Sequence, residues 1–159
     1  MRITVLCVGK IKEKFFAEAL KEYGKRLGRY CRLEIVEVAD ERTPDGASQA
    51  QNQQILRSEG QRILTKIPAQ SHVVALAIEG KQPDSVELAE RIRDLGVRGI
   101  SHITFIIGGS LGLAREVMER ADEAVSFSRM TFPHQLMRVI LLEQIYRAYR
   151  IMNGEPYHK

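Results

Sequence analysis

Two short apolar runs, separated by a helix-like segment, are the feature that most constrains the fold of this chain. Residues 72–78 read HVVALAI and residues 102–107 read HITFII, and after each leading histidine the only polar residue is Thr104. Strands with one face in water alternate apolar and polar residues, whereas strands covered on both faces read as continuous apolar runs. Residues 85–95, between the runs, carry apolar residues at helical spacing. The runs therefore predict parallel strands joined by a helical crossover.

The rest of the chain continues the same alternation of strand-like and helix-like segments. No repeat, linker or low-complexity tract interrupts it, so residues 1–159 are expected to form a single domain. The predicted fold class is α/β, with a mostly parallel sheet and helices on both faces. Further strands are expected at residues 3–8, 33–38 and 123–127, and further helices at residues 12–27, 49–66, 113–120 and 133–152.

The last expected helix is apolar on most of its sides. A helix of that kind is covered on most of its sides, because exposed apolar surface is unfavourable in water. In a small domain one face packs on the sheet, and another face is available for a second copy of the chain. We therefore predict a homodimer. The apolar residues are Leu136, Met137, Val139, Ile140, Leu141, Leu142 and Ile145.

The apolar runs and the cysteine spacing argue against several protein classes. No apolar run approaches the roughly 18 residues of a membrane-spanning helix, and the opening MRITVLCVGK lacks the apolar stretch of a secretory signal. Cys7 and Cys31 lack the CxxC spacing of a redox or zinc motif, so reduced thiols in a cytoplasmic protein are expected. The formal net charge of +4 permits a polyanionic partner without requiring one.

A glycine-rich turn, residues 106–113 (IIGGSLGL), follows the second apolar run and is expected to open a helix. Glycines let the backbone approach a ligand closely, and ligands bind at the carboxyl ends of parallel strands. The turn departs from the dinucleotide fingerprint G-x-G-x-x-G, because Ile107 occupies the first glycine position. Neither Gly9-Lys10 nor Gly80-Lys81 completes a phosphate-binding P-loop. The turn alone thus leaves open a ligand of unknown class or a tight turn without one.

Several segments together are more specific than this turn. They are MRITVLCVGK at the start, HVVALAIEGK, FIIGGSLGL, FSRMTFPHQLMRVILLEQIYRAYRI and the terminal GEPYHK. In order and spacing the chain resembles the ribosomal RNA large subunit methyltransferase H family, small members of the SPOUT methyltransferases. Family members often end in Tyr-His-Arg, where this chain has Tyr157-His158-Lys159; the lysine keeps the charge but loses the bidentate fork of arginine.

The resemblance implies a C-terminal trefoil knot, a homodimer and S-adenosylmethionine as cofactor. It also implies methylation at N3 of a pseudouridine in the subunit-interface hairpin of 23S rRNA, on assembled ribosomes. By the same resemblance, eight residues contact the cofactor: Leu76, Gly108, Phe127, Ser128, Arg129, Met130, Thr131 and Phe132.

The residues expected at the acceptor lie in the last segment of the chain. His158, Tyr157 and Arg138 are the candidate catalytic residues, with His158 favoured because histidine exchanges protons near neutral pH. The tail could act in its own or in the partner's site. Three basic residues, Lys159, Arg147 and His134, are candidates for contact with the RNA, because they concentrate positive charge late in the chain.

Three alternatives remain open at this point. The chain could be a knotted methyltransferase acting on another RNA, such as tRNA, or a ribosome-binding module without catalysis. The third alternative, a nucleotide-dependent oxidoreductase, is less favoured because Ile107 occupies the first glycine position of the dinucleotide fingerprint. No metal is expected, because the four histidines have no ligand spacing and no cysteine or carboxylate cluster accompanies them.

Overall fold

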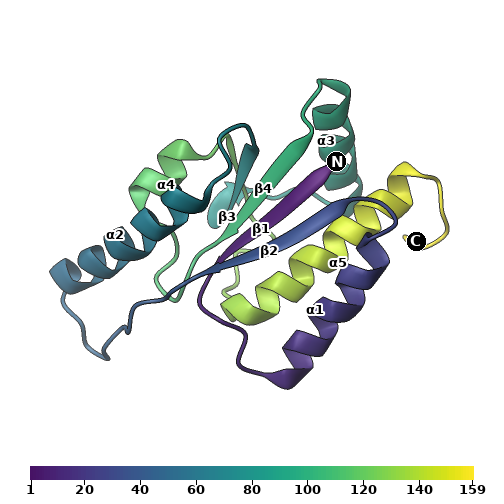
Figure 1. Ribbon diagram of the computed structural model, residues 1–159. Coiled ribbons are helices and arrows are strands. Elements are labelled where there is room, and N and C mark those ends of the chain that lie inside the picture. The colour runs from purple at the N-terminus through teal and green to yellow at the C-terminus, as the bar shows by residue number, and fades with distance from the viewer.

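The two apolar runs form neighbouring parallel strands in a five-stranded sheet. The computed structural model describes all residues, 1–159, and is drawn in Figure 1. The first run is part of β3 (His72–Lys81) and the second is β4 (His102–Ile107), and they pair in parallel with Leu76 opposite Ile107. The crossover between them is α3 (Ser85–Val97). The prediction of two buried parallel strands joined by a helix is confirmed.

The other elements complete an entirely parallel sheet in the order β2-β1-β4-β3-β5. The α/β class, with a parallel sheet covered by helices on both faces, is therefore confirmed. The remaining strands are β1 (Arg2–Val8), β2 (Arg32–Val38) and β5 (Glu123–Val125). The remaining helices are α1 (Lys14–Leu27), α2 (Gln49–Lys66), α4 (Arg115–Arg120) and α5 (His134–Met152).

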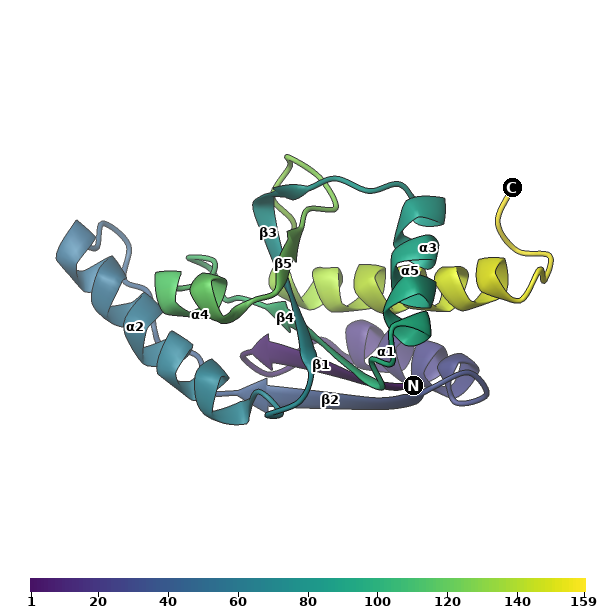
Figure 2. The same cartoon turned by 90° about the horizontal axis from the view of Figure 1, so that it is seen from above.

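The helices divide into two layers, one on each face of the sheet. Helices α1, α3 and α5 pack on one face around the larger core, which includes Phe105 and Leu141. Helices α2 and α4 pack on the other face around a smaller core, which includes Leu6 and Ile106. Figure 2 shows α2 and α4 gathered toward the carboxyl ends of the strands, away from the N-terminus. On that face the end of α2 shares the smaller core with Val73 at the start of β3, whereas the hollow at the amino ends of β1, β2 and β4 is lined by no helix residue.

Local sequence explains where α2 and α3 begin. Ser48 and Asp84 are the residues just before these helices, and each accepts a hydrogen bond from the backbone N–H of the third helical residue. The side chains of Gln51 and Glu87 accept in return from the backbone N–H of the cap residue, completing a capping box in both cases. None of the helices combines the length and the apolar character that crossing a membrane requires.

Three of the expected boundaries that differ from the structure lie near the carboxyl end of the sheet; elsewhere β1, α1, β2, α3 and α5 differ by one or two residues. Helix α4 begins at Arg115 rather than at residue 113, β5 ends at Val125 rather than at residue 127, and β3 continues to Lys81 rather than ending at residue 78. The last extension contains a bulge, since Val125 pairs with both Leu76 and Lys81. These irregular segments form the walls of a cavity.

Candidate cofactor site

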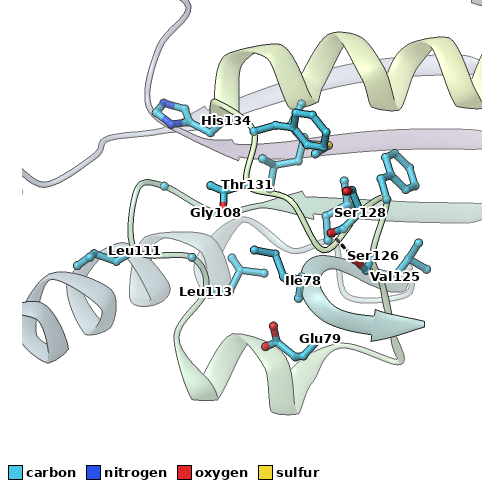
Figure 3. Close-up of a pocket in the computed structure, with 18 of the residues that line it drawn as sticks. Ile78, Glu79, Gly108, Leu111, Leu113, Val125, Ser126, Ser128, Thr131 and His134 are labelled. Carbon is cyan, nitrogen blue, oxygen red and sulfur yellow. Dashed lines mark hydrogen bonds between the residues drawn. The ribbon is translucent and has the colours of Figure 1, made fainter. Parts of the chain in front are cut away.

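A cavity of about 540 Å³ lies at the carboxyl ends of β3 and β4. That volume is within the range of small-molecule sites, and most of its lining side chains are hydrophobic. Figure 3 shows Ile78 and Glu79 on one side of the cavity and Thr131 and His134 on the other, with Gly108 between them. The cavity is thus built mainly from three segments: residues 76–79 of β3, residues 107–113 after β4 and residues 125–134 between β5 and α5.

The glycine turn forms the floor of the cavity and requires glycine for steric reasons. A Cβ at Gly108 would lie 2.4 Å from the carbonyl oxygen of Gly112 and 2.6 Å from its carbonyl carbon. The turn is closed by a hydrogen bond from the N–H of Gly112 to the carbonyl oxygen of Gly109, and Gly112 has a φ of +85°. The backbone therefore approaches itself more closely than any side chain would allow.

The expectation that this turn opens a helix is wrong. Helix α4 starts at Arg115, three residues beyond Gly112, and has only six residues. The free N–H groups of a helix N-terminus therefore do not face the ligand directly. The reason is local: the Gly109–Gly112 bridge closes the turn first, and Ala114, whose side chain cannot cap a helix, precedes α4.

The loop after β5 forms the opposite wall and is held by its own serines. Ser126 donates from its backbone N–H to the carbonyl oxygen of Lys81 at 2.7 Å and from its hydroxyl to the carbonyl oxygen of Ser128 at 2.9 Å. The hydroxyl of Ser128 accepts from the backbone N–H of Met130 at 2.9 Å. These bonds fix the loop, while the side chain of Met130 stays 71% exposed at the mouth of the cavity.

Seven of the eight residues expected at the cofactor line this one cavity, and Arg129 does not. The structure thus brings together segments that are up to 56 residues apart in sequence, from Leu76 to Phe132. Sequence reasoning missed Ile78 and Glu79, which also line the cavity. The sequence signal that could have pointed to these two residues was Gly80. A Cβ at Gly80 would lie 2.7 Å from the backbone nitrogen of Val125, and the strand bulges just before this close approach.

His134 is the histidine that lines the cavity, at the first position of α5. Burial and the nearby guanidinium of Arg138 lower the pKa of His134, partly offset by the carboxylate of Asp40. A lowered pKa leaves the imidazole neutral near pH 7, in a form that accepts a proton. His134 was expected at the RNA; the structure places it in the cavity wall, with its ring near Gly9 and Asp40.

Arg138 lies in the core and is absent from the cavity wall. Its side chain is 1% exposed, forms an ion pair with Glu37 at 2.7 Å and donates to the carbonyl oxygen of Gly9 at 2.7 Å. It also donates to the carbonyl oxygen of Val8 at 3.3 Å. These partners belong to β2 and to the end of β1, so Arg138 ties α5 to the sheet. The structure does not bring Arg138 together with the tail.

The tail folds back along the second half of α5 and lies outside the cavity. The hydroxyl of Tyr157 donates to Glu143 at 3.0 Å, and the guanidinium of Arg147 lies 3.3 Å from Nδ1 of His158 and 4.6 Å from the ring centre of Tyr157. Glu143 and Arg147 are six and ten residues along α5 from Met137, which lines the cavity, so they lie roughly 9 and 15 Å from it along the helix. Lys159 follows His158 at the C-terminus, which Figure 1 marks C. One chain therefore holds the cavity and the tail as two separate groups.

No three His, Cys, Asp or Glu side chains lie close enough together to hold a metal ion. Both cysteines are free, and burial raises the pKa of Cys7 to about 12 and that of Cys31 to about 11. Both groups therefore remain thiols near neutral pH.

A parallel α/β sheet with a mostly apolar cavity at its carboxyl edge is typical of α/β proteins that bind a small molecule, and comparison with known proteins identifies the family. A family model described as "Predicted SPOUT methyltransferase" matches residues 1–158. The protein named ribosomal RNA large subunit methyltransferase H from Bifidobacterium adolescentis is 62% identical over the full length of both chains, and its namesake from Clostridium novyi is 58% identical, also over both full lengths. The chain belongs to the ribosomal RNA large subunit methyltransferase H family of SPOUT methyltransferases.

Among solved structures, a probable methylase family protein from Haemophilus influenzae Rd KW20 has a similar fold. The match has a TM-score of 0.52 at 10% identity and covers 96% of this chain. This chain spans 66% of the length of that structure. At such low identity the likeness extends to the arrangement of the sheet and helices only.

Proposed function

We propose that this chain transfers a methyl group from S-adenosylmethionine to 23S rRNA. The acceptor is N3 of a pseudouridine in the subunit-interface hairpin, within assembled ribosomes, which puts the reaction in the cytoplasm. The observation that carries the proposal is the 62% identity, over both full lengths, to a relative named ribosomal RNA large subunit methyltransferase H. The cavity at Gly108 supports it independently, because it offers a ligand site where the family resemblance expects the cofactor.

The residues of the cavity fit S-adenosylmethionine. The cofactor has a flat adenine and a cationic sulfonium, and the cavity offers apolar side chains such as Leu76, together with Glu79 as a carboxylate. The close approach at Gly108 leaves backbone groups, rather than a side chain, facing the ligand. When bound, the cofactor supplies a methyl group on a good leaving group, so the protein need only hold the acceptor in line and accept a proton.

The proton on the acceptor nitrogen requires a nearby base. We assign that role to the partner's His158, which the partner's Tyr157 and Arg147 position, since the tail of the same chain is held by Glu143 and Arg147, roughly 9 to 15 Å along α5 from the cavity-lining Met137. His134 of the same chain is neutral near pH 7 and lines the cavity. It is placed to orient the acceptor base by a hydrogen bond.

A homodimer in which each tail reaches the other chain's cavity follows from this separation. Leu136 and Ile140 on α5 are only half-buried and pack against neither core, so they are available to a second copy. Sedimentation at micromolar concentration is expected to give the mass of a dimer. A monomeric mass would contradict the shared site.

Complementation tests the shared site directly. A Gly108→Ala chain has a defective cavity and an intact tail, and a chain lacking residues 157–159 has the reverse. Each protein alone is expected to be inactive. Mixed under conditions that exchange subunits, they should recover about a quarter of native activity, since half the dimers are mixed and each mixed dimer has one complete site. No recovery from exchanged dimers would place the tail in its own chain's site.

The resemblance also leads us to infer a trefoil knot at the C-terminal end. Strand β5 lies at the sheet edge beyond β3, whereas α5 packs against both α1 and α3. The segment that joins β5 to α5 must therefore cross the connection between β3 and α3, and such a crossing is what a knot requires. Figure 2 draws that connection as an arch over α5. Joining the two ends covalently in the folded state and then denaturing the ring tests the inference. A knotted ring migrates faster than an unknotted ring of the same mass.

Binding of the cofactor separates the proposal from a ribosome-binding module without catalysis. Calorimetric titration with S-adenosylmethionine should give one site per chain. No heat at millimolar cofactor would favour the non-catalytic module, whereas binding followed by methylation of tRNA alone would favour a different RNA substrate.

A further inference from the structure

A second cavity lies at the opposite edge of the sheet from the cofactor site, where the strands begin. It has a volume of about 560 Å³ and is lined by Arg2, Arg32 and His102, with Met1, Gln70 and Ser101 beside them. The volume is roughly twenty times that of one water molecule, ~30 Å³ in the liquid. Neither the cofactor site nor the tail uses any of these residues.

Strand register places the three basic groups in one row. Arg2 of β1 pairs with Arg32 of β2 on one side and with His102 of β4 on the other. Neighbouring strands are about 4.8 Å apart, so the row spans roughly 10 Å. Residues paired in this way point to the same face of the sheet. It is the face on which α2 and α4 pack (Figure 2), and no helix residue lines the cavity at this row.

The positive charge in this row has no partner within the protein. Arg2 and Arg32 are exposed, and no ion pair joins either guanidinium to a carboxylate. The nearest acidic residue along β2, Glu34, lies one row further and pairs in register with Thr4. Like charges on directly paired strand residues repel each other. An anion bound in the cavity would attract both guanidinium groups and so offset the repulsion between them.

His102 completes the row with a neutral imidazole. Its Nε2 lies 2.8 Å from the hydroxyl of Thr4, which fixes the ring and leaves Nδ1 facing away from that bond. Burial and the guanidinium of Arg2 lower the pKa of His102, partly offset by Glu34. A bound anion would offset the charge of Arg2 and therefore raise this pKa, which gives the site a spectroscopic reporter.

We infer that this row of Arg32, Arg2 and His102 binds a backbone phosphate of RNA, at a second contact remote from the methylated base. Two guanidinium forks on adjacent strands match the oxygens of one phosphodiester, and the open cavity admits the sugars on either side. The inference rests on the proposed RNA substrate. A large folded RNA is required, because one short hairpin in the cofactor site would not reach around the sheet.

The test compares two double variants with equal charge loss. Arg2→Gln/Arg32→Gln removes the row, and Arg93→Gln/Arg98→Gln removes two exposed, unpaired arginines on and just after α3. Binding of the full-length protein to assembled ribosomes is measured against salt, without cofactor. The first variant should bind about tenfold more weakly with a salt slope lower by about one or two, while the second binds as native.

Equal weakening in both variants would overturn the inference, since net charge alone would then explain it. Native binding by the first variant would also overturn it. Because Arg2→Gln/Arg32→Gln removes two like charges that repel each other, its unfolding temperature should equal or exceed that of the native protein. Thermal unfolding therefore shows directly whether the variant is folded. These binding results do not depend on methyl transfer. If the first variant binds and methylates like the native protein, only the second RNA contact is refuted. If the native protein does not methylate the RNA but its binding still depends on Arg2 and Arg32, only the proposed reaction is refuted.

NMR of the His102 ring distinguishes the source of the phosphate. A short RNA strand should raise the pKa of His102 in the native protein and leave it unchanged in the Arg2→Gln/Arg32→Gln variant. If inorganic phosphate shifts the resonance and RNA does not, the cavity is a site for a free anion and the inference fails.

Discussion

Replacement of Gly108 by alanine tests the cavity through a single added carbon atom. The new Cβ would be 2.4 Å from the carbonyl oxygen of Gly112, whereas carbon and oxygen in ordinary close contact are about 3.3–3.6 Å apart. The turn must therefore open by about 1 Å. The clashing atoms are backbone atoms, so no side chain can rotate away. Such overpacking costs about 1–3 kcal/mol of unfolding free energy.

The same displacement acts directly on the cavity, because residues 107–113 form its floor. A misplacement of about 1 Å in a binding or reacting geometry reduces function on the order of a hundredfold. We expect Gly108→Ala to weaken the binding of S-adenosylmethionine by about that factor in calorimetric titration, while circular dichroism shows a folded protein.

Gly99→Ala is the matched control. Gly99 has a φ of +87° with no atom within 4 Å of an added Cβ, and it lies outside the cavity. Alanine there costs about 1–2 kcal/mol from backbone conformation alone. The two variants should thus lose similar stability in urea unfolding but differ in cofactor binding. Native affinity in the Gly108→Ala variant would refute the assignment of the cavity to the cofactor.

Three further variants separate structural from reactive roles. Arg138→Met should lower the free energy of unfolding by about 2–4 kcal/mol, because Glu37 and two carbonyls lose their donor; unchanged stability with lost methylation would instead make Arg138 a catalytic group. Burial raises the pKa of Glu59 above 4.5, so the folded state loses stability as pH rises from there; Glu59→Gln should be more stable than native at pH 7 and equal below pH 4, as followed by urea unfolding. Deletion of residues 157–159 should abolish methylation but spare cofactor titration, and full activity would exclude the tail from the reaction.

The core of the fold follows from local patterns, which is why it could be predicted. The apolar runs at β3 and β4 needed covering on both faces, and alternation with helices left a parallel sheet as the simplest arrangement. Pro133 and the Asn153-Gly154 pair bounded α5 to within one residue. Each of these signals acts over a few residues, so one sequence suffices to interpret them.

The irregular walls of the cavity could not be predicted in the same way. The bulge between Leu76 and Lys81 has no periodicity of its own, and Ile78 continues an apolar run although half of its side chain is exposed. The start of α4 depends on the closure of the turn at Gly112, which is a contact in space.

The separation of the candidate catalytic residues is likewise a property of the folded chain. Arg138 and His158 both fall in the last segment, but Arg138 is buried against Glu37, whereas His158 lies beside Arg147, nine residues further along α5. Charge along a sequence does not distinguish an arginine that holds a core together from one at a surface. Only the partners of each side chain do.

The central claim is tested most directly by methyl transfer to ribosomes from cells that lack this activity. With labelled S-adenosylmethionine, the account predicts that the label enters 23S rRNA, close to one methyl group per ribosome, and that nucleoside digestion places all of it in N3-methylpseudouridine. Label in tRNA, in another nucleoside of rRNA, or no transfer by a protein that binds the cofactor would contradict the account.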